Sequence, residues 1–179
     1  MIYTALFAAL ICAGCFIQIP FPAGVPVVIQ DMAAVLSGML LGHIYGTAAV
    51  AIFLFLGILG LPVFSGKGGL YVLIGGPTCG FLLGYLAAAL AAGLIMKLVS
   101  EDKNAGIRNR AVTVTAATAA NLILFIMGTA GFAHVTESSF SLAAAAVVLP
   151  FIPGNIIKII ITVALTLKFR NRIKEYLKR

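Results

Sequence analysis

Long runs of apolar residues fill most of this chain, and short polar or glycine- and proline-rich stretches separate them. A run of about 18 or more apolar residues is long enough to cross a membrane as a helix. The pattern predicts six such spans, at approximately 2–19, 27–42, 46–61, 80–99, 111–130 and 142–169. The second span is the shortest and begins at Val27 or at Asp31. The predicted fold class is an all-α integral membrane protein, with residues 1–179 forming one six-helix transmembrane domain.

The stretches between the spans contain residues that stop helices. Breaks are predicted at 21–26 (FPAGVP), 43–45, 61–80, 100–110 and 131–140, and a further break at 150–155 (PFIPGN) interrupts the sixth span. Residues 43–45 are expected to form a tight turn, whereas 61–80 is long and rich in glycine. In lipid, non-helical backbone is tolerated only where protein buries it or where it lines a cavity. The breaks at 61–80 and 150–155 therefore indicate either ordinary re-entrant turns or the walls of a transporter site.

Composition agrees with a membrane protein and restricts its function. The chain is 62% hydrophobic and 9% charged, and its mean hydropathy is +1.15. Six spans within 179 residues leave no room for a soluble nucleotide-binding domain, so a partner or a gradient must supply any energy. The net charge of +7 does not indicate nucleic-acid binding, because the basic residues flank apolar spans.

Lysine and arginine residues orient the chain in the membrane. Ten of the 12 lie between spans four and five or in the tail after span six. The positive-inside rule assigns both places to the cytoplasm, and with six spans both termini are then cytoplasmic. No basic residue precedes the first apolar run, which is expected to remain as a span rather than to be a cleaved signal.

The two remaining basic residues, Lys67 and Lys158, lie on the predicted outer side, each beside a broken segment. A lysine near the middle of a membrane helix costs about 2.5–3.5 kcal/mol on insertion scales, so Lys158 is expected to face protein or water. The alternatives are an exposed loop lysine for Lys67 and a side chain that extends to the interface for Lys158. Two cations beside two breaks on one face favour a binding site.

No catalytic or metal-binding constellation is evident, so neither an enzyme nor a cofactor or metal site is expected. Of the five acidic residues only Asp31 adjoins a span. Cys12 and Cys15 have the spacing of a redox motif, but they lie in an apolar run, where two small packing residues are the simpler interpretation. His43 and His134 do not supply enough ligands for a metal ion.

A stripe of small residues marks the first span. Ala5, Ala9 and Ala13 recur every four residues. Such stripes let membrane helices approach closely. The stripe indicates either packing within this chain or a docking face for another membrane protein.

Three segments of the sequence resemble the BioY family, the biotin-binding S components (substrate-capture subunits) of energy-coupling-factor (ECF) transporters. They are LGILGLPVFSGKGGLYVLIGGPTCGFLLGY at 56–85, VPVVIQDMAAVLSGMLLGHIYGTAAV at 25–50 and PFIPGNIIK at 150–158. The resemblance implies an S-component-like bundle of six helices with cytoplasmic termini, located in the plasma membrane of a prokaryote, with one biotin site open to the outside. It also implies three partners, a transmembrane coupling subunit and two ATPases, with docking through Ala5, Ala9 and Ala13.

The resemblance carries over to individual positions. In the glycine-rich stretch the residues that fall on the family's outer loop and pocket are Pro62, Val63, Phe64, Ser65, Gly66, Gly68, Gly69, Tyr71, Gly76, Pro77, Thr78 and Gly80, with Cys79 in place of a usual glycine. Lys158 falls on the motif lysine of the second break, and Asn155 replaces a usual aspartate. Gln30 is a further candidate for the biotin site.

Biotin chemistry suits these positions. Phe64 and Tyr71 are expected to contribute apolar walls for the bicyclic ring and alkyl tail. Asn155, Lys158 and Ser65 are expected to bond the ureido group, and Lys67 with the neighbouring glycines to attract the carboxylate. The residues do not decide which end of biotin points inward.

The exchange at position 155 leaves alternatives open. Asn155 accepts hydrogen bonds less strongly than an aspartate, and it is expected to leave Lys158 without its counter-ion. The chain is therefore interpreted either as a biotin S component or as an S component for another vitamin or heterocycle. A membrane enzyme and a structural membrane subunit without a ligand are the remaining alternatives.

Overall fold

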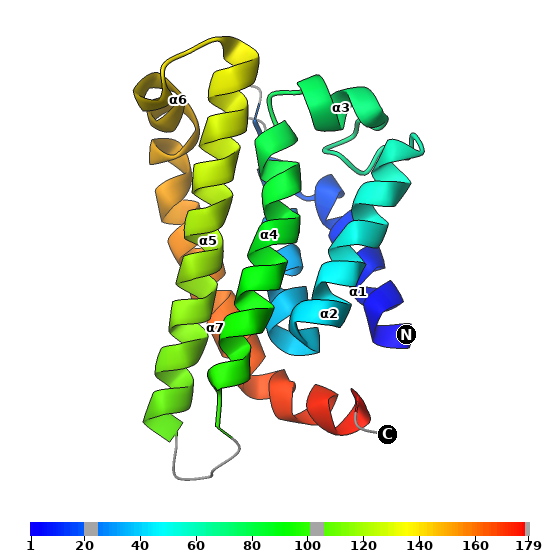
Figure 1. Ribbon diagram of the computed structural model, residues 1–179, viewed down its shortest axis with the longest axis vertical. Helices are drawn as coiled ribbons and strands as arrows, with labels where there is room; N and C mark the ends of the chain where they lie inside the picture. Colours follow the sequence, from blue (N-terminus) through cyan, green and yellow to red (C-terminus); the bar gives the residue numbers. More distant parts are fainter. Residues whose placement is uncertain (20–24, 101–105, 178–179) are drawn as a thin grey trace.

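The computed structural model describes residues 1–19, 25–100 and 106–177, apart from the side chains of residues 171, 174, 176 and 177, and most of these residues are helical. The elements in chain order are α1 (Ile2–Ala13), η1 (Gly14–Phe16), β1 (Gln18–Ile19), β2 (Val27–Val28), α2 (Gln30–Ile58), α3 (Leu70–Gly75), α4 (Cys79–Ile95), η2 (Met96–Leu98), α5 (Gly106–Thr136), α6 (Phe140–Val147), η3 (Leu149–Phe151) and α7 (Ile152–Leu177). The long helices form a bundle, with α3 and α6 at one end and the C-terminal part of α7 at the other (Figure 1).

Four described segments are long and apolar enough to cross a membrane. They are Gln30–Ile58, Cys79–Leu98, Gly106–Thr136 and Phe140–Arg170. The helical segment Ile2–Phe16 is also apolar but shorter, and it ends before the predicted limit of the first span at residue 19. The prediction of a mostly helical, multi-pass membrane protein is confirmed at this level.

Helix α2 contains a reversal of chain direction. Gly42 lies in a non-helical conformation with φ 82° and ψ 176°. A Cβ atom on Gly46 would lie 2.6 Å from the Cα atom of Gly38, whereas residues eight positions apart in a straight helix are separated by about 12 Å. The two limbs of α2 are therefore antiparallel, as the separate second and third spans predicted. The predicted turn at 43–45 is wrong by one residue, because glycine at position 42 provides the positive φ.

Small residues let the central helices approach closely. A side chain on Gly38 of α2 would collide with the carbonyl group of Ala89 on α4. A side chain on Gly80 of α4 would likewise collide with the carbonyl oxygen of Met127 on α5. In lipid, where apolar burial gives little drive for helix association, such close contacts supply the packing energy. Helix α4 consequently lies between α2 and α5 in the bundle.

A short hairpin follows the first helix. Strands β1 and β2 are antiparallel, and Gln18 pairs with Val28 and Ile19 with Val27. The all-α prediction omitted these strands, because two-residue strands leave no periodic signal. The predicted break at 21–26 lies largely outside the described residues.

The glycine-rich stretch contains the short helix α3, which was not predicted. The backbone N–H of Gly69 donates to the carbonyl oxygen of Gly57, at 2.7 Å, and this bond holds the start of α3 against the end of α2. A side chain on Gly68 would collide with the carbonyl groups of Gly60 and Leu61. The glycines therefore allow the stretch to fold tightly over the end of α2.

The last helices differ from the predicted boundaries. Helix α5 covers 106–136 rather than 111–130, so most of the polar loop predicted at 131–140 is helical. The interruption of the sixth span lies at Val148–Phe151, slightly before the predicted 150–155, because Pro150 is in η3 while Gly154 and Asn155 are already in α7. The last part of α7 bends and runs across the lower end of the bundle (Figure 1).

Candidate ligand-binding site

Two adjacent cavities lie near the end of the bundle that carries α3. The inner chamber has a volume of about 40 Å³, and the outer chamber about 330 Å³. Four residues line both: Pro26, Phe64, Ser65 and Thr78. The remaining lining of the inner chamber comprises Val25, Val27, Val28, Gln30, Asp31, Phe81, Leu82, Tyr85, Asn121, Leu124, Phe125, Phe151, Asn155 and Lys158. That of the outer chamber comprises Gln18, Lys67, Tyr71, Val72, Gly76 and Pro77.

The first turns of three helices converge on the inner chamber. Asp31 lies in the first turn of α2, Phe81 in the first turn of α4, and Asn155 and Lys158 in the first two turns of α7. The positive end of the helix dipole and the free N–H groups lie at the start of a helix. The chamber therefore offers an environment that favours a carboxylate, and Asp31 occupies it.

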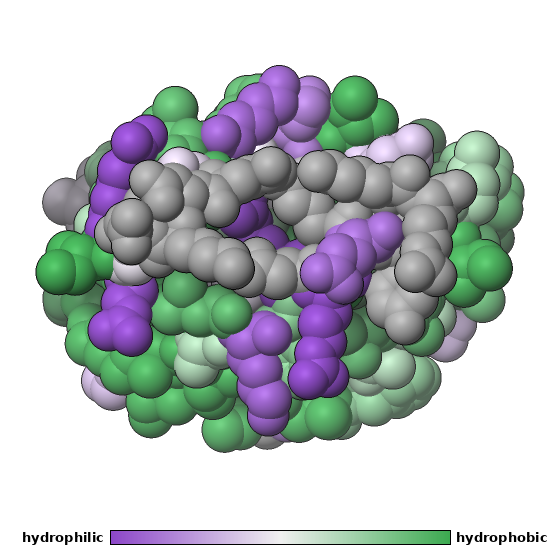
Figure 2. Space-filling model, turned by 90° about the horizontal axis from the view of Figure 1, so that it is seen from below, coloured by the Kyte–Doolittle hydropathy of each residue, from purple (hydrophilic) through white to green (hydrophobic). Residues whose placement is uncertain are grey.

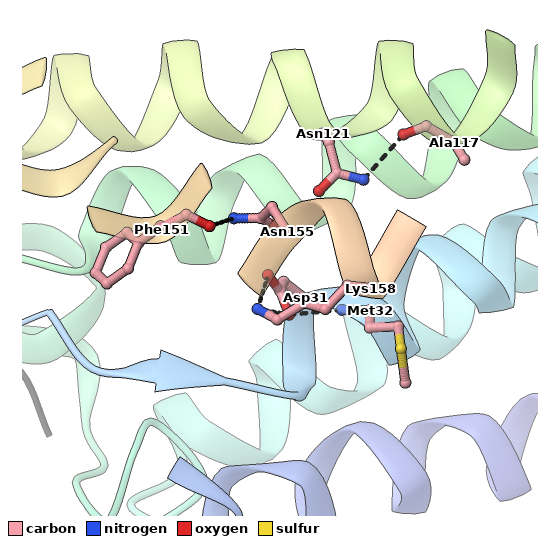
Figure 3. Close-up of polar contacts among 7 residues, drawn as sticks. All are labelled: Asp31, Met32, Ala117, Asn121, Phe151, Asn155 and Lys158. Carbon is pink, nitrogen blue, oxygen red and sulfur yellow. Dashed lines mark hydrogen bonds and ion pairs between the residues drawn. The ribbon is translucent and has the colours of Figure 1, made fainter. Parts of the chain in front are cut away.

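Lys158 and Asp31 form an ion pair across the chamber (Figure 3). The ammonium nitrogen lies 2.7 Å from Oδ2 and 3.0 Å from Oδ1 of Asp31. The side chains are only 14% and 15% exposed. Oδ1 also accepts a hydrogen bond from the backbone N–H of Met32, at 2.7 Å. The expectation that Lys158 lacks a counter-ion is therefore wrong, because α2 supplies the carboxylate that position 155 does not.

Two asparagines extend this polar group. The Nδ2 atom of Asn155 donates to the carbonyl oxygen of Phe151, at 3.2 Å, and that of Asn121 donates to the carbonyl oxygen of Ala117, at 2.9 Å. Both side chains are buried and lie on facing helices (Figure 3). One N–H of each amino group is engaged in this way, and each amide also has an oxygen that can accept a hydrogen bond.

The passage between the chambers carries two hydroxyl groups. Ser65 has a positive φ of 52°, a conformation that costs a non-glycine residue of order 1 kcal/mol or more. Thr78 precedes α4 and makes no capping hydrogen bond through its side chain. Gln30 adjoins the same loop, where its Nε2 atom donates to the carbonyl oxygen of Val63, at 2.7 Å. The shared wall thus combines polar groups with the Phe64 ring.

The structure brings most of the predicted site residues together. Phe64, Ser65, Thr78, Asn155, Lys158 and Gln30 line the inner chamber, and Lys67, Tyr71 and Gly76 line the outer one. Gly66, Gly68 and Gly69 line neither cavity. Two of these three, Gly66 and Gly69, have positive φ angles, so their observed role is to turn the backbone that carries Ser65 and Lys67.

Sequence reasoning missed three polar residues of the inner chamber: Asp31, Asn121 and Tyr85. Asp31 stands at the start of a span, and Asn121 lies in the middle of one. Polar or ionisable residues inside membrane segments usually mark functional sites, and this signal was sufficient to find both. Tyr85 gave no comparable signal, since an aromatic residue in a span is usual.

The inner chamber can bind a neutral polar group that both donates and accepts hydrogen bonds. Lys158 offers donors, Asp31 and Asn155 offer acceptors, and Phe81, Leu82 and Leu124 form apolar walls. Within the described ranges, no group of three or more His, Cys, Asp or Glu side chains is arranged to hold a metal ion.

Comparison with known proteins places this architecture in a family. The chain is 38% identical over 167 residues to the biotin transporter BioY of Rhodobacter capsulatus, covering 88% of this chain and 85% of that protein. It is 31% identical over 169 residues to the biotin transporter BioY of Rhizobium etli, covering 92% and 89%. A crystal structure of the S-component for biotin from an ECF-type ABC transporter superposes with a TM-score of 0.81 at 29% identity, covering 94% of this chain and 89% of that one.

These relatives are transporters, in agreement with the prediction that the chain is not an enzyme. The family model described as the BioY family matches residues 1–175, nearly the whole sequence. The resemblance seen in the three sequence segments is thereby confirmed, and the chain belongs to the BioY family.

Proposed function

We propose that this chain captures biotin as the substrate-specific S component of an ECF-type transporter, and that residues 1–179 act as one substrate-binding domain. The observation that carries the proposal is the Lys158–Asp31 ion pair beside Asn155 in an apolar chamber. Membership of the BioY family and the names of the relatives support the choice of biotin.

The ureido group of biotin matches the polar groups of the inner chamber. It has two N–H donors and one strongly accepting carbonyl oxygen. The ammonium of Lys158 can donate to that oxygen, while Asp31 and Asn155 can accept from the two N–H groups. Hydrogen bonds to charged partners are roughly twice as strong as neutral ones, so the ion pair provides more affinity than two neutral amides would.

The sizes of the two chambers support one orientation of the ligand. The inner chamber of about 40 Å³ is small, and the outer chamber of about 330 Å³ is lined by Lys67 and Tyr71. We place the ureido end inside and the valeryl carboxylate outside, near Lys67. The aromatic side chains of Phe64 and Tyr71 would then contact the ring and tail.

Titration calorimetry with the purified chain tests this function. Biotin is expected to bind one to one, and desthiobiotin, which keeps the ureido group, is expected to compete. A chain that binds neither compound but binds another vitamin from a panel would have a different ligand, and Asn155 would then mark the altered specificity.

The proposed membrane arrangement has six crossings. It counts α1, the two limbs of α2, α4, α5, and α6 with α7, and it places both termini in the cytoplasm of a prokaryotic cell, across the plasma membrane. The termini both lie toward the lower end of the bundle, where α4 ends and α5 begins (Figure 1), and the segments that meet there contain Lys97 and Arg108. Labelling of single cysteines from either side of the membrane would contradict this topology if the two termini reacted from opposite sides.

The small-residue stripe of α1 supports a docking role. Ala5, Ala9 and Ala13 are exposed, whereas Ala8 and Gly14 on the other side of the helix are buried. The stripe is thus not used for packing among the described residues of this chain. We assign it to a transmembrane coupling subunit that associates with two ATPases.

Replacing Ala9 by tryptophan is expected to weaken assembly with the coupling subunit by about 10-fold or more, because a bulky side chain keeps the helices apart. Ala130→Trp on α5 is the matched control, since Ala130 is also exposed on a membrane helix. Copurification of the complex measures assembly, and biotin titration verifies that both variants fold. Equal assembly of Ala9→Trp and the parent would contradict the assigned face.

A further inference from the structure

A third cavity, the basic pocket, lies at the end of α4 remote from the ligand chambers. It has a volume of about 280 Å³ and is lined by Met39, Leu40, Leu41, Gly42, His43, Gly93, Met96, Lys97 and Arg170. The ligand chambers contact the first turns of α4, whereas the basic pocket contacts Gly93, Met96 and Lys97 near its end. The nearest lining residues on this helix are Tyr85 and Gly93, and at 1.5 Å per residue about 12 Å of helix separates them.

The reversal of α2 creates one wall of this pocket. Gly42 ends the first limb, and His43 begins the second. A Cβ atom on Gly93 would lie 2.5 Å from the Cα atom of His43, so the missing side chain lets the turn lie directly against α4. The second limb begins at the pocket, whereas the first limb of α2 and helix α4 end there, so the helix dipoles together do not favour an anion and the basic side chains must supply the positive potential.

Three basic side chains from three elements line the pocket: His43, Lys97 and Arg170. The Nη2 atom of Arg170 donates to the carbonyl oxygen of Met96, at 3.0 Å, and this bond fixes the guanidinium group at the wall. Lys97 is exposed and forms no ion pair with any residue in the part of the chain that the structure describes. No acidic residue is among the described residues that line the cavity. The pocket is therefore a site for an anion.

The other walls are apolar, and the pocket opens at an end of membrane-spanning helices. Met39, Leu40, Leu41 and Met96 form these walls. The surface at this end carries hydrophilic residues among hydrophobic ones (Figure 2). Just beyond the pocket, Lys168 lies over the ring of the exposed Phe169, 5.4 Å from its centroid. Cations beside apolar side chains are the usual surroundings of a phospholipid headgroup at a membrane interface.

We propose that the basic pocket binds the phosphate group of an anionic phospholipid from the leaflet that meets this end of the bundle. Lys97 and Arg170 contact the phosphate oxygens, His43 donates a further hydrogen bond, and the methionine and leucine side chains contact the glycerol and first acyl carbons. The bound lipid connects the turn of α2, the end of α4 and the bend of α7. This site does not depend on the identity of the ligand in the two chambers.

Native mass spectrometry of the detergent-solubilised chain, titrated with phosphatidylglycerol or with phosphatidylcholine of the same acyl chains, tests the proposal. One phosphatidylglycerol is expected to bind in preference to phosphatidylcholine. Lys97→Gln is expected to weaken this binding by about 5-fold, the usual contribution of one basic residue near anionic lipid. Arg110→Gln is the matched control, because Arg110 is an exposed basic residue that does not line the pocket.

Three results would overturn the proposal: equal binding of the two lipids, equal losses in Lys97→Gln and Arg110→Gln, or displacement of the lipid by low millimolar inorganic phosphate. The second would indicate general attraction to a basic surface, and the third would assign the pocket to a soluble phosphate compound. Thermal midpoints measured without lipid verify that both variants fold.

Discussion

Replacing Lys158 by alanine is expected to lower the affinity for biotin by about 100-fold or more. The variant loses the cation that donates to the ureido oxygen. It also leaves the carboxylate of Asp31, which is only 15% exposed, without its counter-ion. With an uncompensated charge, a chamber with apolar walls is expected to bind the neutral ureido end of biotin poorly. Titration calorimetry measures the loss.

Lys67→Ala is the matched control for this variant. Lys67 lines only the outer chamber, and it is proposed to attract a carboxylate that remains close to water. Its loss is expected to weaken binding by less than about 10-fold, because ion pairs exposed to solvent contribute about 0–1 kcal/mol. A larger effect of Lys67→Ala than of Lys158→Ala would contradict the proposed orientation of biotin.

Moving the carboxylate from position 31 to position 155 tests whether biotin binding depends on the charge alone or also on the position of the charge. Asp31→Asn is expected to weaken biotin binding, since Lys158 then lacks an anion. Residue 155 is buried, and it lies three positions before Lys158 on α7. An aspartate at position 155 can therefore reach the lysine. The double variant Asp31→Asn, Asn155→Asp is therefore expected to regain most of the affinity. Failure of this second change to restore binding would show that the carboxylate must come from α2.

Replacing Gly38 by alanine is expected to destabilise the bundle by about 1–3 kcal/mol or more. The added methyl group would collide with the backbone of Ala89 on α4, which cannot rotate away as a side chain can. The two helices must then separate along their contact, although the substitution adds only one carbon atom.

The matched control is Gly154→Ala. Gly154 is also a helical glycine, but a Cβ atom there would have nothing within 4 Å, so little change is expected. Thermal unfolding can be followed with a thiol-reactive dye, because Cys15 and Cys79 are buried and become accessible on unfolding. Equal midpoints for Gly38→Ala and Gly154→Ala would contradict the role of the close contact between α2 and α4.

The hydrophobic pattern determined the class of the protein and most of its helices. Whether a segment lies in lipid depends on the length of its apolar run, which the sequence shows directly. Helix α4 therefore starts within one residue of the predicted fourth span. The predicted second and third spans correspond to the two antiparallel limbs of α2. The cost of a lysine in a span predicted that Lys158 faces protein or water, and its side chain is only 14% exposed and paired with Asp31. Predicted boundaries differ from the observed ones where polar residues such as His134 continue a helix into the predicted loop.

Only the tertiary structure decided how the site is assembled. Asp31 and Lys158 are 127 positions apart, and no local pattern connects them. The absence of a carboxylate at position 155 was therefore wrongly taken to mean that Lys158 has no counter-ion. Asn121 likewise lines the chamber from α5, a helix that packs closely against α4, for example at Gly80. The length of each apolar run in the sequence determines which segments cross the membrane. The pairing of distant charges depends on close helix contacts, which the sequence signals only as scattered small residues.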